Sequence, residues 1–214
     1  MKVSLRVCQL LNSRLCHDLA GGISALSTGA ELLAEDPTSL DAGALGLITM
    51  SADQTANRLQ FMRTAFGMGG GQGGGQGDGS VIAAYTLNKL TQDFLHGGRV
   101  QLQWQTANMD MDIMAGKLLL NMCLIASEAL PKGGQLEVNL GDVENRLGFG
   151  IAAVGEGANL SDEMRAAINV YADSENLTPR TVNGYFMTVL AAQLGAELEI
   201  SPPHSDVFQM AALL

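Results

Sequence analysis

Apolar positions divide the chain into two long helical stretches followed by a region of mixed pattern. Up to residue 66, apolar side chains recur at intervals of three and four, which predicts helices over residues 5–34 and 40–66 with a turn at 35–38. The stripe of the first helix contains Leu11, Leu15, Leu19, Ile23, Leu26 and Leu33. The stripe of the second contains Leu45, Ile48, Ala52, Leu59, Met62 and Phe66. The two stretches together predict an antiparallel helical hairpin.

A single hairpin has too little surface to bury both apolar stripes. Two hairpins packed together would cover all four stripes, and a four-helix bundle is the economical way to do so. We therefore expect a homodimer, with the helical hairpin of each chain forming half of the bundle.

Beyond residue 80 helical and strand patterns alternate. Helical spacing is found at 80–95, 111–130, 161–172 and 181–194. Alternation of apolar and polar residues, which is typical of strands, is found at 100–104, 136–140, 147–151, 198–200 and 207–211. These elements predict an α+β fold in which the C-terminal part is an α/β sandwich with one sheet.

A glycine-rich run separates the two parts of the chain. Residues 67–80 read GMGGGQGGGQGDGS, a composition that cannot bury apolar surface. The run contains no lysine, whereas phosphate-binding glycine loops keep a lysine at fixed spacing. We interpret it as a linker and divide the chain into a helical hairpin (1–67), a linker (68–80) and a C-terminal domain (81–214).

Composition excludes several classes of protein. The chain has a net charge of −10 with only 12 Lys and Arg residues, which argues against nucleic-acid binding. No apolar run is long enough to span a membrane, and Arg14 and Asp18 interrupt the start where a signal peptide would be apolar. We expect a cytoplasmic protein. Its 3 cysteines form no C-x-x-C pair, so neither a disulfide scaffold nor a zinc site is expected.

His17 is the candidate for chemistry. At about 100° per residue it points away from the apolar stripe of its helix, so its side chain should be exposed. An imidazole with one unprotonated nitrogen can attack phosphorus and later leave again. Asp18 could orient the ring, and Arg14, one turn away, could meet phosphate charge. A lone exposed histidine is also compatible with an ordinary surface residue.

Two glycines follow this histidine, Gly21 and Gly22. They would remove side chains that hinder a docking partner near His17, or they are simply a weak point of the helix. The pattern of the sequence leaves both interpretations open.

Three segments of the hairpin carry a family resemblance. SRLCHDL at 13–19, GAELL at 29–33 and RLQFMRTAFG at 58–67 resemble the ChpT-type histidine phosphotransferases of alphaproteobacterial cell-cycle phosphorelays. The resemblance implies a dimeric four-helix bundle like that of sensor kinases and a degenerate histidine-kinase ATP-binding (Bergerat) domain at the C-terminus. It implies that His17 is the phosphoacceptor, beside the candidate catalytic residues Asp18 and Arg14 that its surroundings indicate.

The same resemblance implies the partners of the reaction. The phosphoryl group would move by way of His17 between receiver-domain aspartates, those of a hybrid histidine kinase and of response regulators. The receiver domain would supply the magnesium ion, so that no cofactor and no metal ion is expected on this chain.

The boxes that bind ATP in histidine kinases are altered in this sequence. Alignment on the turn at 133–134 places Asn121 at the first asparagine of the N box, but Ile125 where the metal-binding asparagine belongs. Ala153 stands in place of the carboxylate that reads adenine, and the second glycine box reads TVNG at 181–184. Because an apolar side chain cannot ligate magnesium, we expect no use of ATP.

Two other functions fit parts of the pattern. An atypical ATP-dependent histidine kinase would need other residues to replace Ile125 and Ala153. A non-catalytic dimeric adaptor would keep the hairpin and leave His17 without a chemical role. Nucleotide binding would identify the first, and partner binding without phosphohistidine would identify the second.

Overall fold

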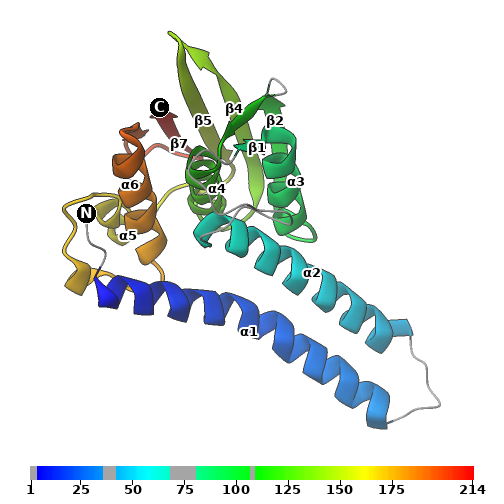
Figure 1. The fold of residues 1–214 in the computed structure, drawn as a ribbon. Coiled ribbons are helices and arrows are strands. Elements are labelled where there is room, and N and C mark those ends of the chain that lie inside the picture. Colours follow the sequence, from blue (N-terminus) through cyan, green and yellow to red (C-terminus); the bar gives the residue numbers. More distant parts are fainter. Residues whose placement is uncertain (1–3, 36–41, 68–80, 107–108) are drawn as a thin grey trace.

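The computed structural model describes residues 4–35, 42–67, 81–106 and 109–214. Helices α1 (Leu5–Glu35) and α2 (Ala42–Phe66) form a long antiparallel hairpin. The remainder of the chain forms a compact domain that sits on one end of the hairpin, so that the other end projects freely (Figure 1). The expected hairpin is therefore present, with helix ends close to those predicted. The glycine-rich linker at 68–80 lies outside the described residues.

The C-terminal domain combines a mixed sheet with helices. Its helices are α3 (Ala84–Leu95), α4 (Ile113–Glu128), α5 (Asp162–Ala167) and α6 (Val182–Leu194), with a short 3₁₀ turn at Ser174–Asn176. Its strands are β1 (Val81–Ala83), β2 (Val100–Thr106), β3 (Asp110–Asp112), β4 (Gly134–Val143), β5 (Arg146–Val154), β6 (Glu197–Ile200) and β7 (Val207–Leu213).

Five of these strands form the main sheet, in the order β2-β4-β5-β7-β6. Strands β2 and β4 are parallel and the other neighbours are antiparallel. Alternate residues of β4, such as Leu136 and Val138, are buried on the face that α4 covers. Helix α4 is buried along almost its whole length, which explains why its sequence is so uniformly apolar. This arrangement confirms the predicted α+β class.

One small element was not predicted. Strands β1 and β3 pair as a separate two-stranded ribbon, with Val81 opposite Asp112 and Ala83 opposite Asp110. The expectation of a single sheet was therefore wrong, and the helices predicted from 80 and 111 begin at 84 and 113. Strands of three residues are too short to show alternation, so only their pairing partner reveals them.

Aromatic stacking and a buried amide fix the C-terminal domain to the hairpin. The ring of Phe61 on α2 stacks on Phe94 of α3 with centroids 4.3 Å apart. The fully buried Asn121 of α4 donates from Nδ2 to the carbonyl oxygen of Ala65 at 3.1 Å. Because these contacts are buried, the domain holds a defined position beside the end of α2.

The first turns of α1 make a second junction. Nε of Arg6 donates to the carbonyl oxygen of Ser174 at 2.9 Å, and its Nη2 donates to that of Glu175 at 3.0 Å. Val7 is buried in a small apolar cluster with Val182 of α6. The contact between the hairpin and the C-terminal domain is thus anchored at two places, the end of α2 and the start of α1. The segment of α1 between them passes beside the domain (Figure 1).

Glycine permits the close approach of the two long helices. A Cβ atom added at Gly22 would collide with the Thr55 side chain of α2, and one added at Gly29 would lie 2.6 Å from Cγ1 of Ile48. Gly21 differs, because a Cβ atom there would meet nothing within 4 Å. Neither interpretation drawn from the sequence accounts for Gly22, which close packing against α2 explains, whereas Gly21 leaves open surface near His17.

We predict opposite effects of alanine at these adjacent glycines. Gly21→Ala should raise the free energy of unfolding by about 0.5–1 kcal/mol, because alanine restricts the unfolded chain and favours helix. Gly22→Ala should lower it by about 1 kcal/mol or more, because overpacking outweighs that gain. Chemical denaturation of both variants checks this. Equal shifts for the two would contradict the packing explanation.

Candidate functional site

His17 lies on the face of α1 that points away from α2. Its side chain is 86% exposed, as the helical periodicity predicts. Gly21, one turn further along the same face, presents no side chain beyond its Cα atom. The imidazole is therefore accessible to a second macromolecule without any rearrangement of the hairpin.

Asp18, which is itself bound by Arg14, lies against one side of the imidazole. Oδ1 of Asp18 lies 3.3 Å from Nδ1 of His17, and its Oδ2 accepts from Nε of Arg14 at 2.7 Å. The Asp18 side chain is only 8% exposed, in contrast to the histidine beside it. The structure thus brings the three residues singled out in the sequence together, and leaves Nε2 of His17 as the nitrogen away from Asp18.

Glu128, which was not predicted from the sequence, completes this cluster. It is the last residue of α4, and its Oε1 accepts from Nη2 of Arg14 at 2.6 Å. The guanidinium that was expected to meet phosphate is thus shared between two carboxylates. One signal was available in the sequence: a glutamate at a helix C-terminus opposes the helix dipole and therefore needs another reason to be there.

Burial and charge shift the acid–base equilibria of this cluster. Removal from water raises the pKa of the Glu128 carboxyl to about 7, and the Asp18 charge adds to this while Arg14 opposes it. Burial alone would lower the pKa of Arg14, but the charges and hydrogen bonds of Glu128 and Asp18 together raise it. Arg14 therefore remains a cation at any physiological pH, and Glu128 titrates close to neutrality.

We predict that Glu128 makes stability depend on pH. Its pKa is raised from 4.5 to about 7 in the folded protein, so between these values the folded state keeps a proton that the unfolded state has lost. Its contribution to the free energy of unfolding is thus complete below pH 4.5 and is lost as the pH rises to 7, by about 3 kcal/mol in all. In Glu128→Gln, the denaturation midpoint should change less with pH across this window than it does in the wild type. An unchanged slope in the variant would contradict the prediction.

The positions that would hold ATP in a kinase are part of the apolar core. Ile125 and Ala153 are both fully buried within one hydrophobic cluster. The amide of Asn121 donates to the carbonyl oxygens of Ala65 and Lys117, so its Nδ2 is engaged in holding the hairpin. Across the part of the chain that the structure describes, no group of three or more His, Cys, Asp and Glu side chains is placed to hold a metal ion.

None of the helices in the described residues combines the length and the apolar character needed to cross a bilayer.

The chain is similar to known phosphotransferases. A family model described as the histidine phosphotransferase C-terminal domain matches residues 85–206. The chain is 30% identical over 198 residues to the protein phosphotransferase ChpT of Brucella abortus (strain 2308), which covers 92% of this chain and 91% of that protein.

Solved structures extend the likeness to the whole fold. A bacterial phosphotransferase is similar with a TM-score of 0.83 and 28% identity, covering 99% of this chain and 98% of that chain. A histidine kinase domain from a blue-light activated kinase of Erythrobacter litoralis gives a TM-score of 0.52 at 12% identity, covering 98% and 93%. The second likeness shows the fold alone, and it confirms the expected kinase-like architecture.

Proposed function

The chain belongs to the histidine phosphotransferase family, and from this premise we propose that it is a phosphorelay protein that carries a phosphoryl group on His17. The donor and acceptor are receiver-domain aspartates, those of a hybrid histidine kinase and of response regulators. ATP takes no part in the reaction, and the chain works in the cytoplasm as a homodimer.

The observation that carries this proposal is an exposed imidazole with one nitrogen held by a carboxylate. Nδ1 of His17 faces Asp18, so Nε2 is directed toward solvent and toward any docked partner. Phosphoryl transfer requires in-line positioning and charge neutralisation more than it requires covalent machinery. A receiver domain that brings its own magnesium ion can supply the neutralisation. The histidine then needs only to be accessible and correctly oriented.

The absence of an ATP-dependent step rests on the buried positions of the former kinase boxes. Ile125 and Ala153 replace a metal ligand and an adenine-reading carboxylate, and both are packed inside the core. Apolar side chains at these positions offer neither an oxygen to magnesium nor an acceptor to adenine.

We predict that magnesium-ATP does not bind with useful affinity. The missing adenine contact alone should cost about 1–3 kcal/mol, and the missing metal ligand adds to that cost. Titration calorimetry with magnesium and ATP should show no saturable heat at micromolar nucleotide. Micromolar, magnesium-dependent binding would instead favour the atypical kinase.

A homodimer is supported by apolar side chains left exposed along one side of the hairpin. Ile23 on α1 is 54% exposed, and Leu59 on α2 is 47% exposed. Burial against a second hairpin contributes about 25 cal/mol per Å² of apolar surface.

Incubation with a panel of phosphorylated receiver domains tests the proposed function. Radiolabel should move from a cognate receiver to this chain, resist alkali and be lost in acid, as expected of a phosphohistidine. The label should then move on to a second receiver. Binding of receivers without any transfer would support the non-catalytic adaptor in place of the phosphotransferase.

A further inference from the structure

Four polar side chains connect the C-terminal domain to the phosphotransfer helix. Glu128 on α4 binds Arg14, Arg14 binds Asp18, and Asp18 faces His17, at distances of 2.6, 2.7 and 3.3 Å. The first three side chains are at most 25% exposed, whereas the fourth is open to solvent. Exposure falls from 25% at Glu128 to 19% at Arg14 and 8% at Asp18, and then rises to 86% at His17.

The second partner of Arg14 affects how strongly its guanidinium is engaged by Asp18. A guanidinium paired with Asp18 alone would neutralise most of that carboxylate. Because Arg14 donates to both Asp18 and Glu128, its guanidinium is shared between two carboxyl groups and is not devoted to Asp18. Glu128 also fixes the far side of the guanidinium, which limits how Arg14 and therefore Asp18 can rotate.

We propose that Glu128 is a positioning residue for phosphotransfer: through Arg14 it holds Asp18 as the acceptor of a proton on Nδ1 of His17, which keeps Nε2 unprotonated as the nucleophile. The inference rests on the proposed role of His17 as phosphoacceptor. It gives the C-terminal domain, which lacks the residues for ATP use, a direct part in preparing the histidine.

The step that this arrangement favours is balanced without an added acid or base. The lone pair of Nε2 attacks the phosphorus of a receiver aspartyl phosphate, and the bond from phosphorus to the aspartate oxygen breaks with its electron pair on the carboxylate. Nδ1 keeps its proton, so the phosphorylated ring carries a positive charge. The Asp18 carboxylate stabilises that charge, and the reverse sequence returns the phosphoryl group to a second aspartate.

Ring nitrogen chemical shifts of His17 test the proposal directly. Long-range ¹H–¹⁵N NMR of the unphosphorylated full chain should show the proton on Nδ1. In Glu128→Ala the population should shift toward the tautomer protonated on Nε2, and transfer from a phosphorylated receiver should slow by about tenfold, by analogy with the loss of a hydrogen-bond partner behind a metal-bound histidine. Glu128→Gln, which keeps an oxygen for Arg14 but no charge, should lie between the two.

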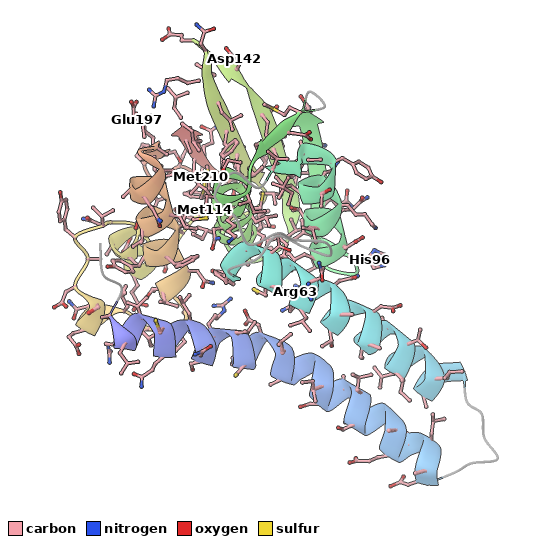
Figure 2. The ribbon with its side chains drawn as sticks, in the orientation of Figure 1. Arg63, His96, Met114, Asp142, Glu197 and Met210 are labelled. Atoms are coloured by element: carbon pink, nitrogen blue, oxygen red, sulfur yellow. The ribbon has the colours of Figure 1, made fainter. Side chains whose placement is uncertain are left out.

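Glu197→Gln is the matched control. Glu197 accepts from Nη1 of Arg146 at 2.8 Å, and Figure 2 shows it at the end of the C-terminal domain away from α1. This variant loses an ion pair of the same type and should match the wild type in both measurements. If wild type shows no transfer at all, the proposed function fails while the tautomer comparison still stands. A folded Glu128→Ala or Glu128→Gln protein with the wild-type tautomer overturns the positioning role.

Discussion

Replacing His17 by alanine or asparagine is expected to abolish phosphotransfer and leave the fold intact. The side chain is 86% exposed and fills no cavity, so its removal should change the free energy of unfolding by less than about 0.5 kcal/mol. The loss of activity should be complete, because no neighbouring group can replace a nucleophile that forms the phosphorus–nitrogen bond. Transfer of radiolabel from a cognate phosphorylated receiver measures it.

His204→Ala provides the control for this experiment. His204 is also exposed, but it lies in the loop between β6 and β7, where Nδ1 is 3.0 Å from the carbonyl oxygen of Ser205. Its replacement should leave both transfer and affinity for the receiver unchanged. Exchange of phosphate by the His17→Ala protein, or a wild-type label that survives acid, would show that His17 is not the phosphoacceptor.

Replacement of Arg14 is expected to have a smaller effect on phosphotransfer than replacement of His17. Its guanidinium donates to Asp18 and Glu128, so its loss should disturb the orientation of the cluster without removing the nucleophile. Slower transfer is therefore expected of an Arg14 variant, in contrast to the complete loss expected at His17.

Local periodicity explains why the hairpin and the exposure of His17 could be predicted. Over a helix as long as α1, each residue's direction follows from its position relative to the apolar stripe, and the fold of the hairpin depends on that same stripe. The neighbours Arg14 and Asp18 were found for the same reason, because residues four apart meet on one helix face.

Long-range pairing explains what could not be predicted. Glu128 is 114 residues from Arg14 in the sequence, and only the tertiary fold brings the end of α4 to α1. The ribbon of β1 and β3 likewise exists through pairing of two three-residue segments, neither of which has a pattern of its own. In both cases the identity of the partner is set by tertiary contacts, which periodicity does not report.

The proposed dimer seam follows from the side of each helix that the chain leaves uncovered. On α1, Gly22 faces Thr55 of α2, and Arg14 faces the C-terminal domain. Ile23 lies about half a turn around α1 from Arg14 and about 100° from Gly22, and it is 54% exposed. Leu59 on α2, one turn beyond Thr55, is 47% exposed. His17 lies about 120° around α1 from Ile23 and is 86% exposed, so a dimer through this seam would leave the imidazole free for a receiver domain.

Glutamate at two positions of this seam should convert the dimer to monomers. Ile23→Glu combined with Leu59→Glu removes four apolar side chains from a two-fold interface, each contributing about 1.5 kcal/mol or more, and so should raise the dissociation constant by about 10⁴-fold. Unpaired carboxylates in the seam add a desolvation penalty. Sedimentation velocity at micromolar protein should show dimers for the wild type and monomers for the variant.

Met50→Glu is the matched control for the seam. Met50 is as exposed as Ile23, but it is nine residues from Leu59 and therefore half a turn around α2, where it lines a recess together with His96 and Gly97. A glutamate there adds the same charge to the same helix without entering the seam, so this variant should sediment as a dimer. The seam would be misplaced if Met50→Glu dissociated the protein as strongly as the double variant, and the dimer itself would be excluded if the wild type sedimented as a monomer.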